Sequence, residues 1–149
     1  AQVESQDTVE VRYDSENFLS EESSLRISAP AGKEVNVAAT TEFIPVRPNT
    51  QYELSGWLKT EGIYGSGYAV MGWYEDNARW RNSRNMDIIS AIETCGWQPF
   101  RQVITTLPTT QRVMLKTGLW RAYGTVWVEG VRFVQVEEGA DQVKPLCTK

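Results

Sequence analysis

The 149-residue sequence contains no histidine. Histidine is the commonest general base in enzymes, the commonest ligand of zinc and the usual pH-dependent switch. A nucleophilic serine or cysteine activated by histidine is therefore excluded. The sequence argues against the large hydrolase classes built on such pairs, and against a metal held by histidine.

Long hydrophobic runs and an excess of positive charge are also missing. The longest uncharged, mostly apolar run extends from Tyr68 to Tyr74, whereas a membrane-spanning helix needs about 20 residues. The net charge is −4 and the isoelectric point is near 4.9, so the phosphate backbone of a nucleic acid would be repelled. We expect no membrane and no nucleic acid as a partner.

Cysteine occurs only twice, at Cys95 and Cys147, without the close spacing of a metal-binding clip. The two could form a disulfide that closes a loop of about 50 residues, worth roughly 4 kcal/mol in the chain-entropy model. They could equally be two free thiols, and the sequence leaves both states open. The chain begins Ala1-Gln2 with no Met and no apolar leader, as a cleaved secretory protein or an excised module does. We predict a secreted, extracellular location.

Alternation of apolar and polar residues is the main pattern that is present, and it is typical of half-buried β-strands. The clearest case is Tyr52–Lys59, in which the even-numbered residues form the predicted inner face. Similar short segments lie at 8–13, 24–28, 35–39, 42–46, 68–75, 100–106, 112–117 and 124–134. Glu61–Gly67 is predicted as a glycine-rich loop, and Met86–Glu93 as either a short helix or a strand. Turn residues between the strands predict one all-β domain over residues 1–149, an antiparallel β-sandwich.

Tryptophan and tyrosine are in surplus, with six of each. Strand alternation places Trp57 and Trp73 on faces that also carry polar residues, while arginine neighbours mark Trp80 and Trp120 as surface. A sugar ring stacks its apolar face on an indole, and charged or amide side chains bind its hydroxyls. The predicted carbohydrate-binding residues are Trp57, Lys59, Trp73, Glu75, Trp80, Arg81, Lys116 and Trp120.

A surplus of tryptophan can also serve the core. For Trp57, Trp73 and Trp127, which lie on strands, packing beneath loops at a sheet edge is as open as ligand binding. For Trp97 the core is the favoured place. The aromatic residues therefore allow both interpretations, and only their exposure decides between them.

Residues that would mark a catalytic centre are not singled out by their spacing. A glycoside hydrolase needs two facing carboxylates, and Glu53, Glu75, Asp76 and Glu129 form no such pair in the sequence. The glycine-rich loop is not followed by Lys-Ser or Lys-Thr, so it does not cradle phosphate. We predict that the protein is not an enzyme. The alternatives are a small polysaccharide lyase or hydrolase on the same fold, and an adhesive domain that contacts other proteins.

Several segments together resemble the carbohydrate-binding modules of the family 4, 9 and 22 type. They are Ser24-Leu-Arg-Ile27, 46–60 with its Ser-Gly-Trp-Leu-Lys core, 68–76 and Gly124-Thr-Val-Trp-Val-Glu-Gly-Val131, in that order within residues 24–134. The resemblance implies a jelly-roll β-sandwich whose concave sheet binds a glycan chain in a cleft. It also implies a structural calcium ion near the chain ends, for which Glu129 would supply a carboxylate.

The function expected from this resemblance is that of a non-catalytic polysaccharide-binding module. Its partners would be a polysaccharide or oligosaccharide and the catalytic domain of a parent enzyme, which the module would tether to its substrate. Basic residues such as Lys59 and Lys116 leave room for an acidic glycan, whereas the net negative charge favours a neutral one.

Overall fold

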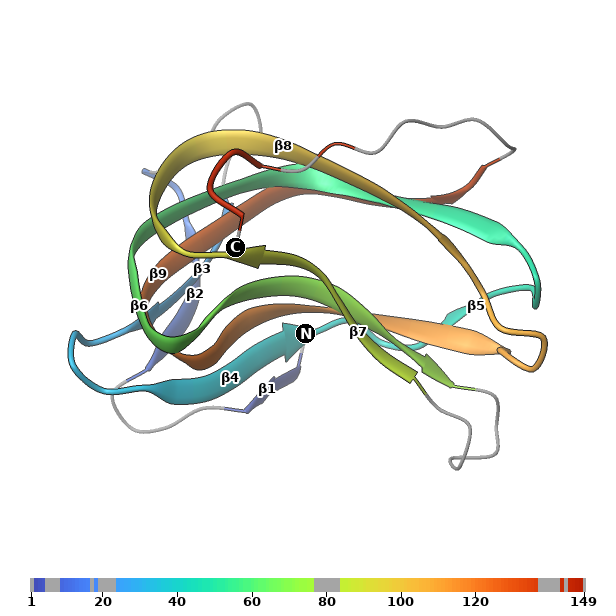
Figure 1. Ribbon diagram of the computed structural model, residues 1–149, viewed down its shortest axis with the longest axis horizontal. Coiled ribbons are helices and arrows are strands. Elements are labelled where there is room, and N and C mark those ends of the chain that lie inside the picture. The colour runs from blue at the N-terminus through green and yellow to red at the C-terminus, as the bar shows by residue number, and fades with distance from the viewer. Residues whose placement is uncertain are drawn as a thin grey trace.

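Burial along β6 (Gln51–Asp76) confirms the predicted inner face of its first half. Tyr52, Leu54, Gly56 and Leu58 are buried, and the residues between them are half-buried. A strand that is buried on one face only needs an apolar layer against that face, and here a second sheet covers the buried face of β6. The computed structural model describes residues 2–4, 9–16, 18, 24–76, 84–136, 143 and 145–148. In this part of the chain all regular secondary structure is β-strand, in two facing layers (Figure 1).

The other strands are short at the N-terminal end of the chain and long at its C-terminal end. They are β1 (Gln2–Glu4), β2 (Glu10–Asp14), β3 (Ser24–Ala29), β4 (Val35–Thr40), β5 (Ile44–Pro45), β7 (Arg84–Ala91), β8 (Glu93–Thr105) and β9 (Arg112–Gln135). All pairings between them are antiparallel. No described helix is long and apolar enough to cross a membrane.

Two strands, β6 and β9, belong to both layers. In the first layer their residues 52–61 and 125–135 pair with each other, and the order is β2-β3-β9-β6-β8. In the second layer their residues 68–76 and 112–120 pair, and the order is β1-β4-β9-β6-β7, with β5 beside the start of β9. Figure 1 shows both strands curving from one layer into the other at the left of the view. This arrangement confirms the predicted antiparallel β-sandwich.

Glycines allow the two strands to turn this corner together. Gly65 and Gly124 have φ angles of 122° and 116°, which favour glycine. A Cβ on Gly124 would lie 2.3 Å from the carbonyl oxygen of Gly62, so no side chain fits there. The predicted loop Glu61–Gly67 is therefore wrong, because the backbone ladder continues through this bend.

Two further expectations about strands are settled in the same way. The predicted separate strands at 112–117 and 124–134 are one strand, β9, because the ladder with β6 runs through the corner. The segment Met86–Glu93, which the sequence left open, is mostly strand β7, paired with the second half of β6.

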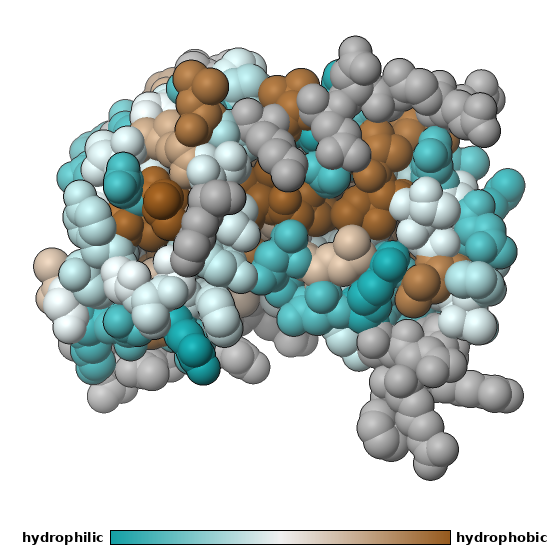
Figure 2. Space-filling view, viewed as in Figure 1, coloured by the Kyte–Doolittle hydropathy of each residue, from teal (hydrophilic) through white to brown (hydrophobic). Residues whose placement is uncertain are grey.

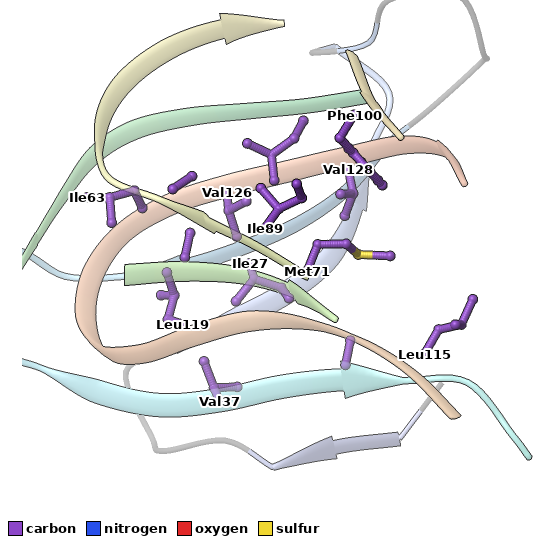
Figure 3. Close-up of a cluster of buried hydrophobic side chains, with 14 of the residues drawn as sticks. Ile27, Val37, Ile63, Met71, Ile89, Phe100, Leu115, Leu119, Val126 and Val128 are labelled. Atoms are coloured by element: carbon purple, nitrogen blue, oxygen red, sulfur yellow. The ribbon is translucent and has the colours of Figure 1, made fainter. Parts of the chain in front are cut away.

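The hydrophobic core lies between the two layers (Figure 3). Ile27, Val126 and Val128 come from the first layer, and Val37, Met71 and Leu119 from the second. On the face shown in Figure 2, hydrophobic side chains gather in a band across the middle, with hydrophilic residues around it. The inner faces of the two layers thus supply the side chains of the core.

Candidate functional site

Trp73, predicted to face the ligand, belongs to the core instead. Its side chain is fully buried, and its ring meets Phe133 edge to face, with centroids 5.5 Å apart. Its indole N–H donates to Oε1 of Glu75 over 3.1 Å. The prediction was wrong because Glu75, on the same strand face, made that face look solvated.

Glu75 is a buried structural carboxylate rather than a sugar-binding one. It is 1% exposed and forms an ion pair with Arg84. Its Oε2 accepts hydrogen bonds from the Thr110 hydroxyl over 2.7 Å and from the Leu107 backbone N–H over 3.3 Å. Buried carboxylates need such partners. Glu75 therefore fixes the turn between β8 and β9, and its predicted role toward a ligand is corrected.

Trp57 and Lys59 lie on the outer face of the first layer, and both are half-buried. Lys59 covers Trp127, with Nζ 4.9 Å from the ring centroid. The Trp127 N–H donates to Oδ2 of Asp14 over 3.0 Å, which leaves that ring only 4% exposed. On this face Trp57 is accessible and Trp127 is not. Trp97 is half-buried rather than part of the core.

Trp80 and Arg81, predicted at the rim of the site, lie outside the described residues. Their predicted role stays a prediction. The remaining two predicted residues, Trp120 and Lys116, come together on the outer face of the second layer.

That face carries a hollow of about 490 Å³. Ala38, Gly118 and Val70 lie opposite one another on three neighbouring strands. Because they carry short side chains or none, the floor of the hollow is close to the backbone of the sheet. A Cβ on Gly118 would lie 1.9 Å from the carbonyl oxygen of Val37, so only glycine fits between the strands. The described residues that line the hollow are Asn36, Val37, Ala38, Tyr68, Val70, Asn85, Asp87, Lys116, Leu119 and Trp120.

Two aromatic rings stand at one side of this hollow. Trp120 is 42% exposed, which confirms that it is a surface residue. Its ring tilts against Tyr68 at 45°, with centroids 5.3 Å apart. The neighbouring Arg121 adopts a positive φ of 49°, places its guanidinium 5.0 Å from the Trp120 ring centroid, and donates its backbone N–H to Oδ1 of Asn36 over 2.9 Å. These contacts hold an indole partly open to solvent.

A hydrogen-bonded charged network adjoins these rings and includes the Tyr68 hydroxyl. Oδ1 of Asp87 accepts from Nζ of Lys116, and Oδ2 accepts from the Tyr68 hydroxyl, each over 2.8 Å. Partial burial alone would raise the pKa of Asp87, but the hydrogen bonds from Lys116 and Tyr68 outweigh it and hold its pKa below 3.8. The hydrogen bond to Asp87 raises the pKa of Tyr68 above 10.0. The hollow therefore presents fixed, mutually neutralised polar groups.

Sequence reasoning missed most of this site. Tyr68 and Asp87 were not selected, nor were Asn36 and Asn85. Asp87 lies in the segment that could not be assigned as helix or strand, so its face was unknown. Tyr68 could have been found by its position at the start of an alternating segment, on the face opposite Trp73.

The calcium ion that the resemblance implies would need six to eight oxygen ligands. Glu129, its predicted ligand, is 3% exposed and lies opposite Trp57 on β9. Within the described residues, no group of three or more His, Cys, Asp or Glu side chains could hold a metal ion. A calcium ion at Glu129 would depend mainly on backbone carbonyl ligands, and it stays a prediction.

Cys95 and Cys147 are free thiols, and both are half-buried. The C-terminal segment brings them together: the Ile92 N–H donates to the carbonyl of Cys147 over 3.2 Å, and Val143 exchanges two backbone hydrogen bonds with Arg101. Burial, with the hydrogen bond to Cys95, raises the pKa of Cys147 to about 12. The two thiols are neighbours in space, as a disulfide would require, but they are not bonded.

Comparison with known proteins extends only to structure. No protein-family model matches the sequence, and no curated protein sequence is similar to it. The xylan-binding domain CBM22-2 of Paenibacillus barcinonensis Xyn10C matches with a TM-score of 0.61 and 11% identity, over 90% of this chain and 91% of that domain. Modules of families 4 and 16 match as well. The chain has the fold of carbohydrate-binding modules.

Two matches place this fold inside larger proteins. One is the CBM22-1–GH10 part of the Clostridium thermocellum endo-1,4-beta-D-xylanase 10B, complexed with xylohexaose (TM-score 0.63, 10% identity, 93% of this chain and 26% of that one). The other is the enzymatically active domain of the bacteriophage CBA120 tailspike protein 4 (TM-score 0.62, 16% identity, 90% of this chain and 19% of that one). The chain thus spans about a fifth to a quarter of these two structures. At such identities the likeness concerns the fold alone.

Proposed function

We propose that this chain is a non-catalytic module that binds a polysaccharide in the hollow of the second layer. The observation that carries the proposal is the exposed Trp120 ring, tilted against Tyr68, beside hydrogen-bonding groups at Asn36, Asp87 and Lys116. An apolar ring face bordered by such groups suits a sugar, whose ring has an apolar face and a hydroxyl rim. A purely apolar ligand would leave these polar groups unpaired, at a cost in free energy.

The charge of the hollow favours a neutral glycan. Asp87 is neutralised by Lys116 and also accepts from Tyr68, and the other polar lining residues are the amides Asn36 and Asn85. An acidic sugar would need a free cation, and among the described lining residues the one cation is already paired with Asp87. Sugar hydroxyls can instead donate to Asp87 and accept from Lys116 without disturbing this balance.

Chemistry on the bound sugar is not part of the proposal. Asp87 is the one carboxylate among the described residues that line the hollow, whereas glycoside hydrolysis uses two.

Tethering of a larger secreted enzyme to its polysaccharide is the biological role that we propose. It is supported by the match to a module joined to a GH10 domain and by the xylan-binding domain with the same fold.

The test is binding of Trp120→Ala to a panel of neutral β-linked polysaccharides, measured by affinity electrophoresis and calorimetry. A stacking contact is worth on the order of 1–3 kcal/mol, by analogy with bases on aromatic rings, so the affinity should fall about tenfold or more. Tyr13→Ala is the matched control, because Tyr13 is an aromatic residue that is 74% exposed and lies outside the hollow.

Two results would contradict the proposal. One is that the wild-type protein binds no polysaccharide on the panel, or binds with the same affinity after the Trp120 substitution. The other is release of reducing ends or unsaturated products from any substrate, abolished by a single substitution in the hollow.

A further inference from the structure

The outer face of the second layer carries aromatic residues at both of its ends, and the function proposed above uses only one end. In Figure 1 the second halves of β6 and β9 run side by side, between β7 and β4. Tyr68 lies opposite Trp120 at one end of this stretch, and Tyr74 lies opposite Met114 six residues further along β6. At about 3.4 Å per residue, the two tyrosines are about 20 Å apart on the same face.

The aromatic cluster at the far end consists of Phe43, Tyr74 and Arg112. Phe43 directly precedes β5, which pairs with the start of β9, and it is 38% exposed. Its ring tilts against Tyr74 at 57°, with centroids 6.2 Å apart. The guanidinium carbon of Arg112 lies 3.9 Å from the Phe43 ring centroid, and Nε of this arginine donates to Oδ2 of Asp76 over 2.6 Å. An exposed ring is thus held in place by a tyrosine and an arginine.

The cluster beside the hollow has the same composition. Trp120 is 42% exposed, its ring is likewise tilted against a tyrosine of β6, Tyr68, and the guanidinium of Arg121 lies over it. Rings that neighbouring side chains already hold lose little conformational freedom when a ligand stacks on them. Two such rings on one face of one sheet therefore indicate two platforms for the same kind of ligand.

The sheet between the two platforms is low and polar. Asp87 on β7 and Lys116 on β9 both lie opposite Gly72 of β6. A Cβ on Gly72 would lie 3.1 Å from Cε of Lys116, so the ion pair between the two side chains lies close to the backbone of the sheet. Asn85, which lies opposite Tyr74, also lines the hollow. The hollow beside Trp120 therefore continues to the second platform.

We propose that the ligand is an extended glycan chain that lies along β6 and β9 and stacks one sugar ring near Trp120 and another near Phe43. Sugar residues between the two platforms bind Asp87, Lys116 and Asn85 through their hydroxyls. This inference rests on the function proposed above and adds the class of ligand, which is a long neutral chain rather than a short sugar. A disaccharide is too short to reach both rings, whereas a hexasaccharide can reach them.

The test is the dependence of affinity on chain length, measured by calorimetry with xylo-oligosaccharides and cello-oligosaccharides from the disaccharide to the hexasaccharide. In the wild-type protein the hexasaccharide should bind about tenfold more tightly than the disaccharide or better, because it gains a second stacking contact. Phe43→Ala should remove this gain and leave the disaccharide almost unchanged, since that probe still stacks on Trp120. Val134→Ala is the matched control and should change neither affinity, because Val134 is 37% exposed and lies opposite Glu53 in the first layer.

Two further variants of Phe43 separate stacking from folding. Phe43→Leu keeps apolar bulk beside Arg112 but loses the flat ring, so it should weaken the hexasaccharide as alanine does. Phe43→Tyr keeps the ring and should bind as the wild type does. The melting temperatures of all three variants should stay close to that of the wild type, because the side chain is partly exposed.

The inference is overturned if affinity does not rise with chain length, if neither hexasaccharide binds, or if the Phe43→Ala and Phe43→Leu variants bind the hexasaccharide as the wild type does. It is also overturned if these variants weaken both probes equally. Weaker binding in Trp120→Ala together with unchanged binding in Phe43→Ala refutes this inference alone and leaves the proposed function standing. Unchanged binding in Trp120→Ala refutes the proposed function itself.

Discussion

The carboxylate of Asp87 and the ammonium group of Lys116 meet across the hollow of the second layer, with Nζ 2.8 Å from Oδ1. The two residues come from different strands, β7 and β9, with β6 between them. The pair therefore spans the sheet beneath the proposed glycan, and it fixes the positions of these donor and acceptor groups before any ligand binds. Preset donors and acceptors reduce the entropy lost on binding.

Binding at this hollow should be constant over a wide pH range. The pKa of Asp87 is lowered below 3.8 and that of Tyr68 is raised above 10.0. In the folded protein Asp87 therefore stays ionised until the pH falls through its lowered pKa, and Tyr68 stays protonated until the pH rises through its raised pKa. Calorimetric affinity for a neutral glycan should be flat from about pH 5 to 9.

The control for this profile is Asp87→Asn, which removes the acid-side titration and leaves Lys116 unpaired. Its affinity for the neutral glycan should be reduced across the range, without a further loss near pH 4. A wild-type profile with an inflection near neutral pH would show that a different group governs binding.

Trp73 and Trp120 should respond oppositely to truncation. Trp73→Ala leaves a cavity beside Phe133 and strips a partner from Glu75, so the free energy of unfolding should fall by about 3–5 kcal/mol. Trp120→Ala removes an exposed ring and should change it by less than about 1 kcal/mol. Chemical denaturation of the two variants checks this. Equal losses of stability would mean that Trp120 belongs to the packed structure after all.

The thiols of Cys95 and Cys147 should both react once the chain is unfolded without reductant. In the native protein Cys147 should be alkylated slowly at pH 8, because a pKa of about 12 leaves little thiolate. Its rate should rise about tenfold per pH unit up to pH 11, followed by mass spectrometry of the two cysteine peptides. Absence of reactive thiols in the unfolded chain would reveal a disulfide instead.

Calcium, implied by the sequence resemblance, is tested by chelation. If an ion is held at Glu129, EDTA lowers the melting temperature and added calcium restores it, because a ligand of the native state stabilises that state. Glu129→Gln should then melt at the chelated value and no longer respond to calcium. If EDTA leaves the melting temperature unchanged, the protein holds no stabilising calcium ion at Glu129.

The sequence predicted the sandwich because strand alternation and turn residues are local signals. It also placed the inner face of the first half of β6 correctly, from Tyr52 to Leu58. It could not reveal that β6 continues through the Gly65 bend into the second layer, where the ladder shifts register between Gly65 and Tyr68. Shifts of that kind change which residues face inward.

The site was harder to predict because burial of polar residues depends on distant partners. Glu75 suggested a solvated face, yet Arg84 and Thr110 satisfy it in the interior. Trp127 lies on an outer face, yet Lys59 and Asp14 cover it. Trp120 was correctly predicted to be exposed because its arginine neighbour is adjacent in sequence, whereas Asp87 reaches the hollow only through pairing of β7 with β6.

The passage of β6 and β9 through both layers constrains how this chain can fold. Each layer needs β9 between its N-terminal strands and β6, so neither sheet can assemble from the first hundred residues alone. The ends of the ladder join Tyr52 to Gln135, and long loops must close before such contacts stabilise anything. Folding should therefore be slow and all-or-none. During synthesis, the emerging chain exposes unpaired strand edges until Arg112–Gln135 has left the ribosome.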